Sequence, residues 1–270
     1  MPKDLPGSTH MKTRQRKRPV NFATTGSAWE AMNAARRNLD PDEAVQEVWF
    51  LQKQYRRQWS DRMAASPVEL YAVLRTLTQK RIPFVLIGAH GFAAWTGKPR
   101  NTKDVDILVK GGRNLTRAVK AIRGLYPQLQ ERSFPGLIAF FIPGEKESVV
   151  DVIYPHRADL AEALENPVWT ENKEEGVRYR IPTLEAALSS KYGAMLNPSR
   201  ALDQRIQDSA DFTRMVQHSY DEGQLPIDLE RLELLGEKVW PGGGGKEILR
   251  MVEQVKAGKA ISIDSLGVEM

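Results

Sequence analysis

The chain has 270 residues, of which 41% are hydrophobic, and its net charge of +5 comes from 39 basic and 34 acidic residues. No apolar run approaches the roughly 20 residues of a membrane helix, and the basic N-terminus lacks the apolar region of a secretory signal. The hydrophobic content is enough for a substantial core. Because cysteine is absent, disulfides and thiolate metal sites are excluded, and we expect a cytoplasmic protein.

The positive charge is concentrated at the start of the chain. Residues 1–20 hold six basic residues and one acidic residue, so the rest of the chain carries 33 of each sign. We expect residues 1–27 to form a disordered, solvated tail; a tail that contacts RNA is the alternative. Residues 28–66 follow with the pattern of two helices, broken at Asp40-Pro41.

Residues 67–158 alternate between helical and strand patterns. Ser66 and Pro67 indicate the start of a helix, after which IPFVLIG predicts a buried strand and AHGFAAWTG a short helix. DVDILVK, LIAFFIP and SVVDVIYP predict three further strands, and NLTRAVKAIRGLY predicts a helix between the first two of these. This order favours an α/β or α+β sheet with a helical cover.

Residues 159–270 are expected to form a mainly helical C-terminal domain. TLEAALSSKYGAML, with Thr183 as its N-cap, and ALDQRIQDSADFTRMVQH both have helical patterns. The glycine run PGGGGK at 241–246 matches a phosphate-binding loop only in part, because a Walker motif needs glycine in place of Trp240 and Ser or Thr in place of Glu247. We therefore expect a flexible linker at this point.

Two acidic residues stand in a strand that is otherwise apolar. Because side chains alternate across a strand, Asp104 and Asp106 point to one face at its start. Asp151 occupies a similar strand, and the three carboxylates would converge if the two strands were neighbours. Close carboxylates repel, so either one takes up a proton or a cation fills the gap, and oxygen ligands suit Mg²⁺. Three of them could hold two ions about 4 Å apart. The alternative is that each acid pairs with an arginine or caps a turn.

A glycine ends the strand before the acidic pair. Gly88 and Ala89 are small enough for backbone N–H groups to approach a triphosphate, and the N-terminus of the next helix would add positive potential. Taken alone, Gly88 would indicate an ordinary turn, and its position ahead of the acidic pair is what suggests a phosphate-binding role. The spacing disfavours a dinucleotide-binding fold, because Gly88 and Gly91 lack the G-x-G pattern and the acids begin the second strand instead of ending it.

Together these features resemble the nucleotidyltransferase superfamily that includes DNA polymerase beta. The shared pattern is the Gly-Ala step, a short helix, a lone acid on a later strand, and an RxTxDxD motif formed here by Arg100, Thr102, Asp104 and Asp106. RNTKDVD is most similar to the AbiEii-type toxins of bacterial toxin–antitoxin pairs. The resemblance is strong over residues 67–155 and fainter over 182–216, and it does not cover the first 60 or the last 50 residues.

The resemblance implies an α+β nucleotidyltransferase fold, with a mixed sheet and a helical C-terminal domain. It also implies transfer of a nucleotide from an NTP to an acceptor hydroxyl, with two Mg²⁺ ions as cofactors. The implied metal-binding and catalytic acids, among which Asp151 would serve as base, are Asp104, Asp106 and Asp151. The implied nucleotide-binding residues are Gly88, Ala89, Arg100, Thr102, Lys191 and Asp208.

Some of these roles have alternatives. Lys191 would contact phosphate, or it is an exposed helix lysine. Asp208 would help to position the site, or it supports helix packing or pairing, as Asp211 would. Ala89 departs from the family, which often has Gly or Ser there: alanine still offers its backbone N–H but lacks a hydroxyl.

The implied partners are an NTP, a tRNA or protein acceptor, and an antitoxin, without a membrane. Two other functions compete with that of a toxin. An antibiotic-modifying nucleotidyltransferase would use the same metal chemistry on a small-molecule acceptor. A catalytically inactive nucleotide-binding or regulatory protein would show no metal-dependent binding of NTP.

Overall fold

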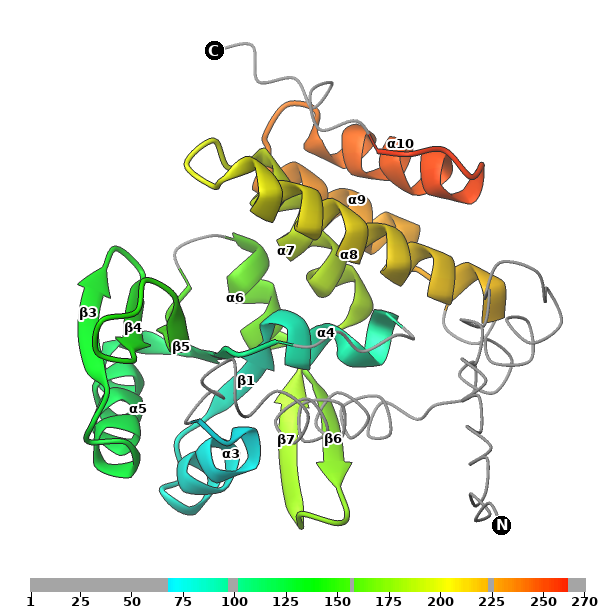
Figure 1. Ribbon diagram of the computed structural model, residues 1–270. Helices are drawn as coiled ribbons and strands as arrows, with labels where there is room; N and C mark the ends of the chain where they lie inside the picture. Colours follow the sequence, from blue (N-terminus) through cyan, green and yellow to red (C-terminus); the bar gives the residue numbers. More distant parts are fainter. Residues whose placement is uncertain (1–67, 97–101, 156–157, 223–225, 262–270) are drawn as a thin grey trace, which may run out of the picture. The chain divides into compact units, whose positions relative to one another are not determined.

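Two sheets and eight helices make up the described part of the chain in the computed structural model (Figure 1). The structure describes residues 68–96, 102–155, 158–222 and 226–261, all within the compact unit Arg36–Met270. The predicted tail, the two helices predicted before Ser66 and the side chain of Arg100 lie outside these ranges. None of the helices within them combines the length and apolarity that a membrane crossing requires.

A mixed five-stranded sheet with the order β1-β2-β5-β4-β3 forms the first layer. β1 (Phe84–Ile87) runs antiparallel to β2 (Val105–Val109), and β2 runs parallel to β5 (Ser148–Ile153). β4 (Leu137–Phe141) and β3 (Gln130–Phe134) complete the sheet as antiparallel strands. The predicted α+β class is confirmed, and each of the four predicted strands is present.

β3 is a strand that the sequence did not predict. All five of its residues are exposed, so QERSF carries no apolar alternation. β3 pairs with β4 at the edge of the sheet. The guanidinium of Arg132, in β3, lies 4.4 Å from the centre of the Phe141 ring in β4. Pairing with a neighbour therefore determines this strand, and local pattern does not.

Three helices adjoin the five-stranded sheet. They are α3 (Leu70–Gln79), α4 (Gly88–Thr96) and α5 (Gly111–Leu125). α5 packs on β2 and β5, α3 packs on α5, and α4 packs on β1, β2 and a later helix, α8. The helix that was expected to start at Ser66 and Pro67, with Ser66 as its N-cap, starts later: α3 begins at Leu70 with Glu69 as its N-cap.

A β-hairpin formed by β6 (Val168–Asn172) and β7 (Val177–Ile181) is a second unpredicted feature. In β7, buried residues alternate with two arginines on the other face, a pattern typical of a half-buried strand. β7 packs on α3 and β1, and Arg180 Nε donates to the Phe84 carbonyl at 2.9 Å. The hairpin therefore covers the β1 side of the sheet.

The remaining helices pack on one another: α6 (Ala158–Glu165), α7 (Leu184–Leu196), α8 (Leu202–Glu222), α9 (Leu229–Val239) and α10 (Gly244–Lys256). α7 is buried around nearly its whole circumference, because α6, α8 and α9 all contact it. Thr183 is confirmed as its N-cap, since its Oγ1 accepts a hydrogen bond from Ala186 N at 3.3 Å.

The glycine run between α9 and α10 is a tight turn, so the prediction of a flexible linker is wrong. The Glu237 carboxylate accepts hydrogen bonds from the backbone N–H groups of Gly242, Gly243 and Gly245, which hold its pKa below the usual range. A Cβ on Gly244 would lie 2.3 Å from the Gly236 carbonyl oxygen. Glycine is needed here because the two helices approach each other closely, and an internal carboxylate fills the nest of N–H groups.

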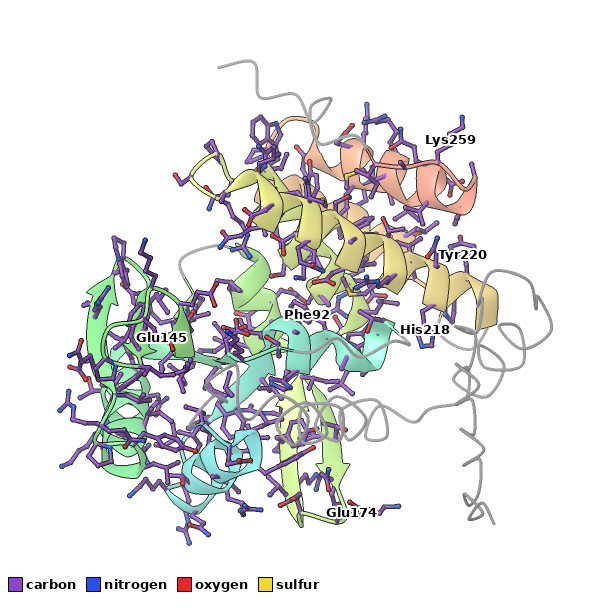
Figure 2. The ribbon with its side chains drawn as sticks, viewed as in Figure 1. Phe92, Glu145, Glu174, His218, Tyr220 and Lys259 are labelled. Atoms are coloured by element: carbon purple, nitrogen blue, oxygen red, sulfur yellow. The ribbon has the colours of Figure 1, made fainter. Side chains whose placement is uncertain are left out.

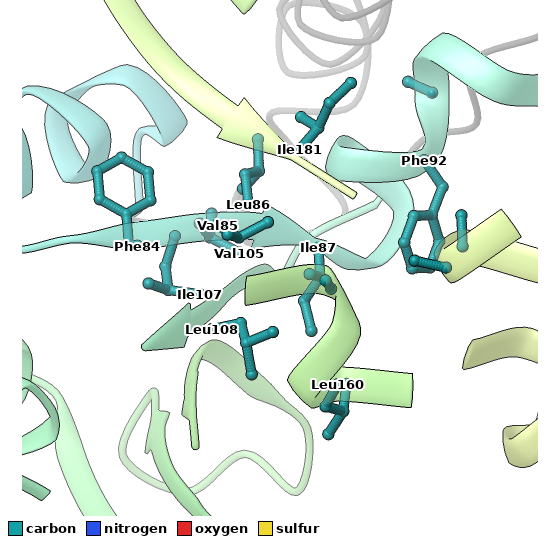
Figure 3. Packing of buried hydrophobic residues seen from close by; sticks show 14 of the residues in the cluster. Phe84, Val85, Leu86, Ile87, Phe92, Val105, Ile107, Leu108, Leu160 and Ile181 are labelled. Atoms are coloured by element: carbon teal, nitrogen blue, oxygen red, sulfur yellow. The ribbon is translucent and has the colours of Figure 1, made fainter. Parts of the chain in front are cut away.

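The main core surrounds β1 and β2, where Val85, Leu86, Ile107 and Leu108 are fully buried. Figure 3 shows Ile181 of β7 beside Leu86, while Leu160 of α6 lies on the side of Ile87 and Leu108. The sheet is covered on both faces here, so it has no exposed face for polar side chains. This explains why β1 and β2 are continuous apolar runs. Asp106 interrupts such a run, and the interruption marks the candidate site.

Candidate active site

Asp106 and Asp151 lie directly beside each other on neighbouring strands. In the parallel pairing of β2 with β5, Asp106 is the register partner of Asp151. Register partners of adjacent strands present their side chains on the same face of a sheet. Asp104 immediately precedes β2, two residues from Asp106, and the structure thus meets the condition on which the predicted convergence depended.

Gly88 provides the other wall of the site. Ile87 pairs with Asp106 across β1 and β2, and Gly88 follows it with φ of +64°, a conformation that favours glycine. A Cβ at this position would lie 1.8 Å from Asp106 Oδ2. Both the backbone angle and the space therefore require glycine, and they place the first turn of α4, which includes Ala89, against the Asp106 carboxylate.

The three acids carry charge of the same sign and repel one another. Burial, followed by repulsion from Asp104 and Asp151, raises the pKa of Asp106 well above its usual range, while Lys191 and Arg200 act in the opposite direction. The pKa of Asp151 rises to about 6, chiefly through burial, against a hydrogen bond with Ser148 and with a further contribution from Asp104. The site therefore favours either a proton or a cation among these carboxylates.

Thr102 supports Asp104 from the start of the strand. The Thr102 hydroxyl donates a hydrogen bond to Asp104 Oδ1, and the Thr102 side chain is buried. This contact orients the Asp104 carboxylate through Oδ1. Contact between Thr102 and a nucleotide stays a prediction.

The donor set suits a divalent cation that arrives with a phosphate ligand. Asp151 Oδ1 is buried and accepts no hydrogen bond from the described residues, an arrangement that costs free energy unless a cation or donor approaches. Among those residues, no three acidic or histidine side chains are gathered as a ready metal site. Mg²⁺ is commonly held by one or two carboxylates together with substrate phosphates, and the aspartates present fit that arrangement.

Lys191 forms the centre of a buried ion-pair cluster. Its Nζ lies 2.8 Å from Asp208 Oδ1 and 2.8 Å from Asp211 Oδ2, and all three residues are buried. The same ammonium lies 5.5 Å from the ring centre of Phe92, labelled in Figure 2, which belongs to α4. The alternative of an exposed helix lysine is therefore wrong, and the predicted pairing of Asp208 and Asp211 is present.

Two half-exposed arginines extend this cluster, and sequence reasoning missed both. Arg200 Nε lies 2.7 Å from Asp208 Oδ2, and Arg214 Nη1 lies 3.4 Å from Asp211 Oδ1. Arg200 lies in a segment, SSKYGAMLNPSRALDQRIQDSADF, that resembles the Lys…Arg…Asp…Asp stretch of the nucleotidyltransferase family, but the sequence analysis gave its arginines no role. Two arginines, Arg200 and Arg205, stand between Lys191 and Asp208, and the sequence alone does not distinguish them.

The predicted residues thus fall into two groups. Gly88, Asp106 and Asp151 meet at one end of the sheet, next to Ala89 in sequence, while Asp104, held by Thr102, precedes Asp106 by two residues. Lys191 and Asp208 lie in the helical cluster, which reaches Asp106 through the charge of Lys191.

No family model and no curated protein matches the chain. Its likeness to solved structures is partial. An antigenic nucleotidyltransferase-like protein from Paracoccidioides brasiliensis shares 15% identity at a TM-score of 0.41, over 73% of this chain and 94% of that one. The antibiotic-resistance factor ANT(2'')-Ia shares 15% identity at a TM-score of 0.40, over 69% of this chain and 94% of that one. A protein from H. pylori assigned as a nucleotidyltransferase shares 14% identity at a TM-score of 0.31, over 70% of this chain and 94% of that one. At these TM-scores the likeness is partial and does not by itself identify a function.

Proposed function

We propose that this protein is a Mg²⁺-dependent nucleotidyltransferase that moves an NMP from an NTP to an acceptor hydroxyl. The observation that carries the proposal is the in-register placement of Asp106 beside Asp151, against a glycine whose Cβ would overlap Asp106. Structural pairing alone does not explain these acids, because burial and the neighbouring carboxylates raise the pKa of Asp106, and burial with a contribution from Asp104 raises that of Asp151.

Asp104 and Asp106 would hold the cation, with Asp151 as a third oxygen ligand. A bound Mg²⁺ would neutralise charge that develops on the phosphates. The acceptor oxygen forms a bond to the α-phosphorus, the bond from that phosphorus to the bridging oxygen of the β-phosphate breaks, and pyrophosphate leaves. Asp151 accepts the proton of the acceptor hydroxyl, which its carboxylate form can do above a pH of about 6. The N–H groups of Gly88 and Ala89 approach the triphosphate.

The acceptor we propose is a tRNA or a protein hydroxyl, and the biological role we propose is that of an AbiEii-type toxin. Support comes from the RNTKDVD segment, whose two aspartates enter the site described above. Toxicity on expression, relieved by a neighbouring regulator, would accord with this role. Growth protection against aminoglycosides would instead favour an antibiotic-modifying enzyme.

Incubation with each α-labelled NTP, Mg²⁺, total tRNA and cell lysate tests the reaction. We expect label to pass from one NTP to an RNA or protein band. The Asp106→Asn variant should lose this transfer by at least about a hundredfold, because it removes a metal ligand. Glu174→Gln, which changes an exposed acid in the turn between β6 and β7, is the matched control and should retain full transfer. Full activity of Asp106→Asn would reject the assignment.

A further inference from the structure

We propose that Arg200, and not Lys191, is the cation that binds the β- and γ-phosphates of the NTP, with Asp208 as the residue that positions it. This inference rests on the proposed nucleotidyl transfer and specifies how the same site recognises its nucleotide. It assigns a role to a residue outside the RxTxDxD motif, to which the sequence analysis gave none.

Lys191 is committed to other partners. Its ammonium has three donors, and two of them meet Asp208 and Asp211 at 2.8 Å each, in a place where the lysine is 6% exposed. A move towards a phosphate would leave two buried carboxylates without their shared cation, which is strongly unfavourable. Lys191 therefore holds the cluster together and acts on the site through its charge.

Arg200 has the opposite character. Its side chain is 40% exposed, and its Nε lies 2.7 Å from Asp208 Oδ2 without the angle of a hydrogen bond. Within the described residues Asp208 is its one ion-pair partner, so the two terminal amino groups of the guanidinium have no partner there. A guanidinium held at Nε with its two amino groups free is suited to bidentate contact with phosphate oxygens.

The location of Arg200 agrees with this role. Asp208 and Lys191 connect it to α4, because Lys191 also lies over Phe92, and α4 begins at the glycine that touches Asp106. The charges with the largest effect on the Asp106 carboxyl include Arg200 but not Arg214. Negative aspartates at one place and a positive guanidinium at the other suit a Mg²⁺-triphosphate, whose metal and terminal phosphates need partners of opposite charge.

Arg214 is a matched control for this hypothesis. It has the same side-chain exposure of 40% and it pairs with Asp211, the other aspartate that holds Lys191. Replacement of either arginine removes one half-exposed ion pair from the same cluster, so the two variants should have similar stability. Only Arg200→Ala should weaken the binding of nucleotide.

The test measures binding by isothermal titration to the full chain with Mg²⁺. The ligands are non-hydrolysable analogues of the four NTPs, and then the diphosphate and monophosphate of the one that binds best. For Arg200→Ala we expect at least about tenfold weaker binding of the triphosphate, the effect of a lost charge-assisted contact, and less than about twofold for the monophosphate. Arg200→Lys should recover part of the loss, and Arg214→Ala should bind all three ligands as the wild type does.

Each other outcome overturns the inference. Unchanged triphosphate affinity in Arg200→Ala would exclude Arg200 from phosphate binding. An equal loss for triphosphate and monophosphate, or the same loss in Arg214→Ala, would show a structural effect of the cluster. A wild-type chain that binds none of the ligands would overturn the proposed function itself, and the inference with it.

Discussion

Asp151 connects the chemistry of the site to pH. Its pKa of about 6 lies far above the 3.8 of an ordinary aspartate, mainly because the group is buried. A base must lose its proton before it can accept one from the acceptor hydroxyl. We therefore expect kcat/KM for nucleotidyl transfer to rise with pH through about 6 and then to level.

The measurement is a pH profile of transfer at several Mg²⁺ concentrations. A bound cation favours the ionised carboxylate, so the apparent pKa should fall as Mg²⁺ increases. A profile that is flat between pH 5 and 8 at low Mg²⁺ would show that Asp151 is not the base.

The same group should affect the free energy of unfolding. Because its folded pKa is raised, the folded state binds the proton more tightly, and ionisation costs stability as pH rises from about 4 through about 6. Asp151→Asn should thus stabilise the metal-free protein at pH 8 by on the order of 1–3 kcal/mol. The gain should be smaller at pH 4.5. Urea denaturation of both proteins in EDTA measures the difference, and a larger gain at the lower pH would contradict the account.

Among single residues, the three acids and Gly88 could be predicted as site residues from the sequence, because each interrupts or ends an apolar strand. A carboxylate in an apolar strand is costly, and a glycine that ends a strand is compatible with a turn or a ligand. The partners of Lys191 were less accessible to prediction. Asp208 and Asp211 follow it by 17 and 20 residues, and only the packing of α7 on α8 makes them neighbours.

At the scale of elements, the junction of β1 with α4 positions the site. Gly88→Ala would place a methyl group 1.8 Å from Asp106 Oδ2 in a backbone conformation with φ of +64°. We expect loss of transfer together with a loss of stability of about 1–3 kcal/mol. Activity assays and thermal unfolding measure the two effects.

Gly112→Ala is the control for this change. It lies in the first turn of α5, and a Cβ there would meet nothing within 4 Å. Its activity should equal that of the wild type, and its stability should stay the same or rise slightly, since alanine favours a helix. Normal activity in Gly88→Ala would show that this junction does not determine the site.

The elements with strong apolar runs were predictable, and those without were not. β1, β2, β4 and β5 each contain a run of buried hydrophobic residues. β3 is exposed throughout, and β6 and β7 are a short hairpin whose stability comes from packing against β1 and α3. β3 and β6 pair with the next strand along the chain, and the alternation in β7 is a local signal that the sequence analysis did not use.

At the scale of the whole molecule, two contacts link α4 to later parts of the chain. Trp95 Nε1 donates to the Pro182 carbonyl at 3.0 Å, and Lys191 lies over Phe92. The ion-pair cluster around Lys191 therefore stabilises the packing of these helices. The positive charge of Lys191 also acts to lower the pKa of Asp106.

Lys191→Met should be strongly destabilising because it leaves Asp208 and Asp211 buried without their shared cation. We expect a loss of about 3–5 kcal/mol in the free energy of unfolding, the usual cost when one partner of a buried pair is removed. Lys120→Met, an exposed position on α5, should change stability by less than about 0.5 kcal/mol. Chemical denaturation distinguishes the two, and a small effect of Lys191→Met would contradict the burial of this cluster.

Binding of Mn²⁺, followed by electron paramagnetic resonance, tests the central claim most directly, since Mn²⁺ accepts the same oxygen ligands as Mg²⁺. With a non-hydrolysable NTP analogue present, the wild-type protein should bind the ion, and Asp106→Asn should lose at least about tenfold in affinity for it. If the wild type leaves Mn²⁺ as free as the analogue alone does, or if Asp106→Asn binds it equally well, these aspartates do not form a metal site.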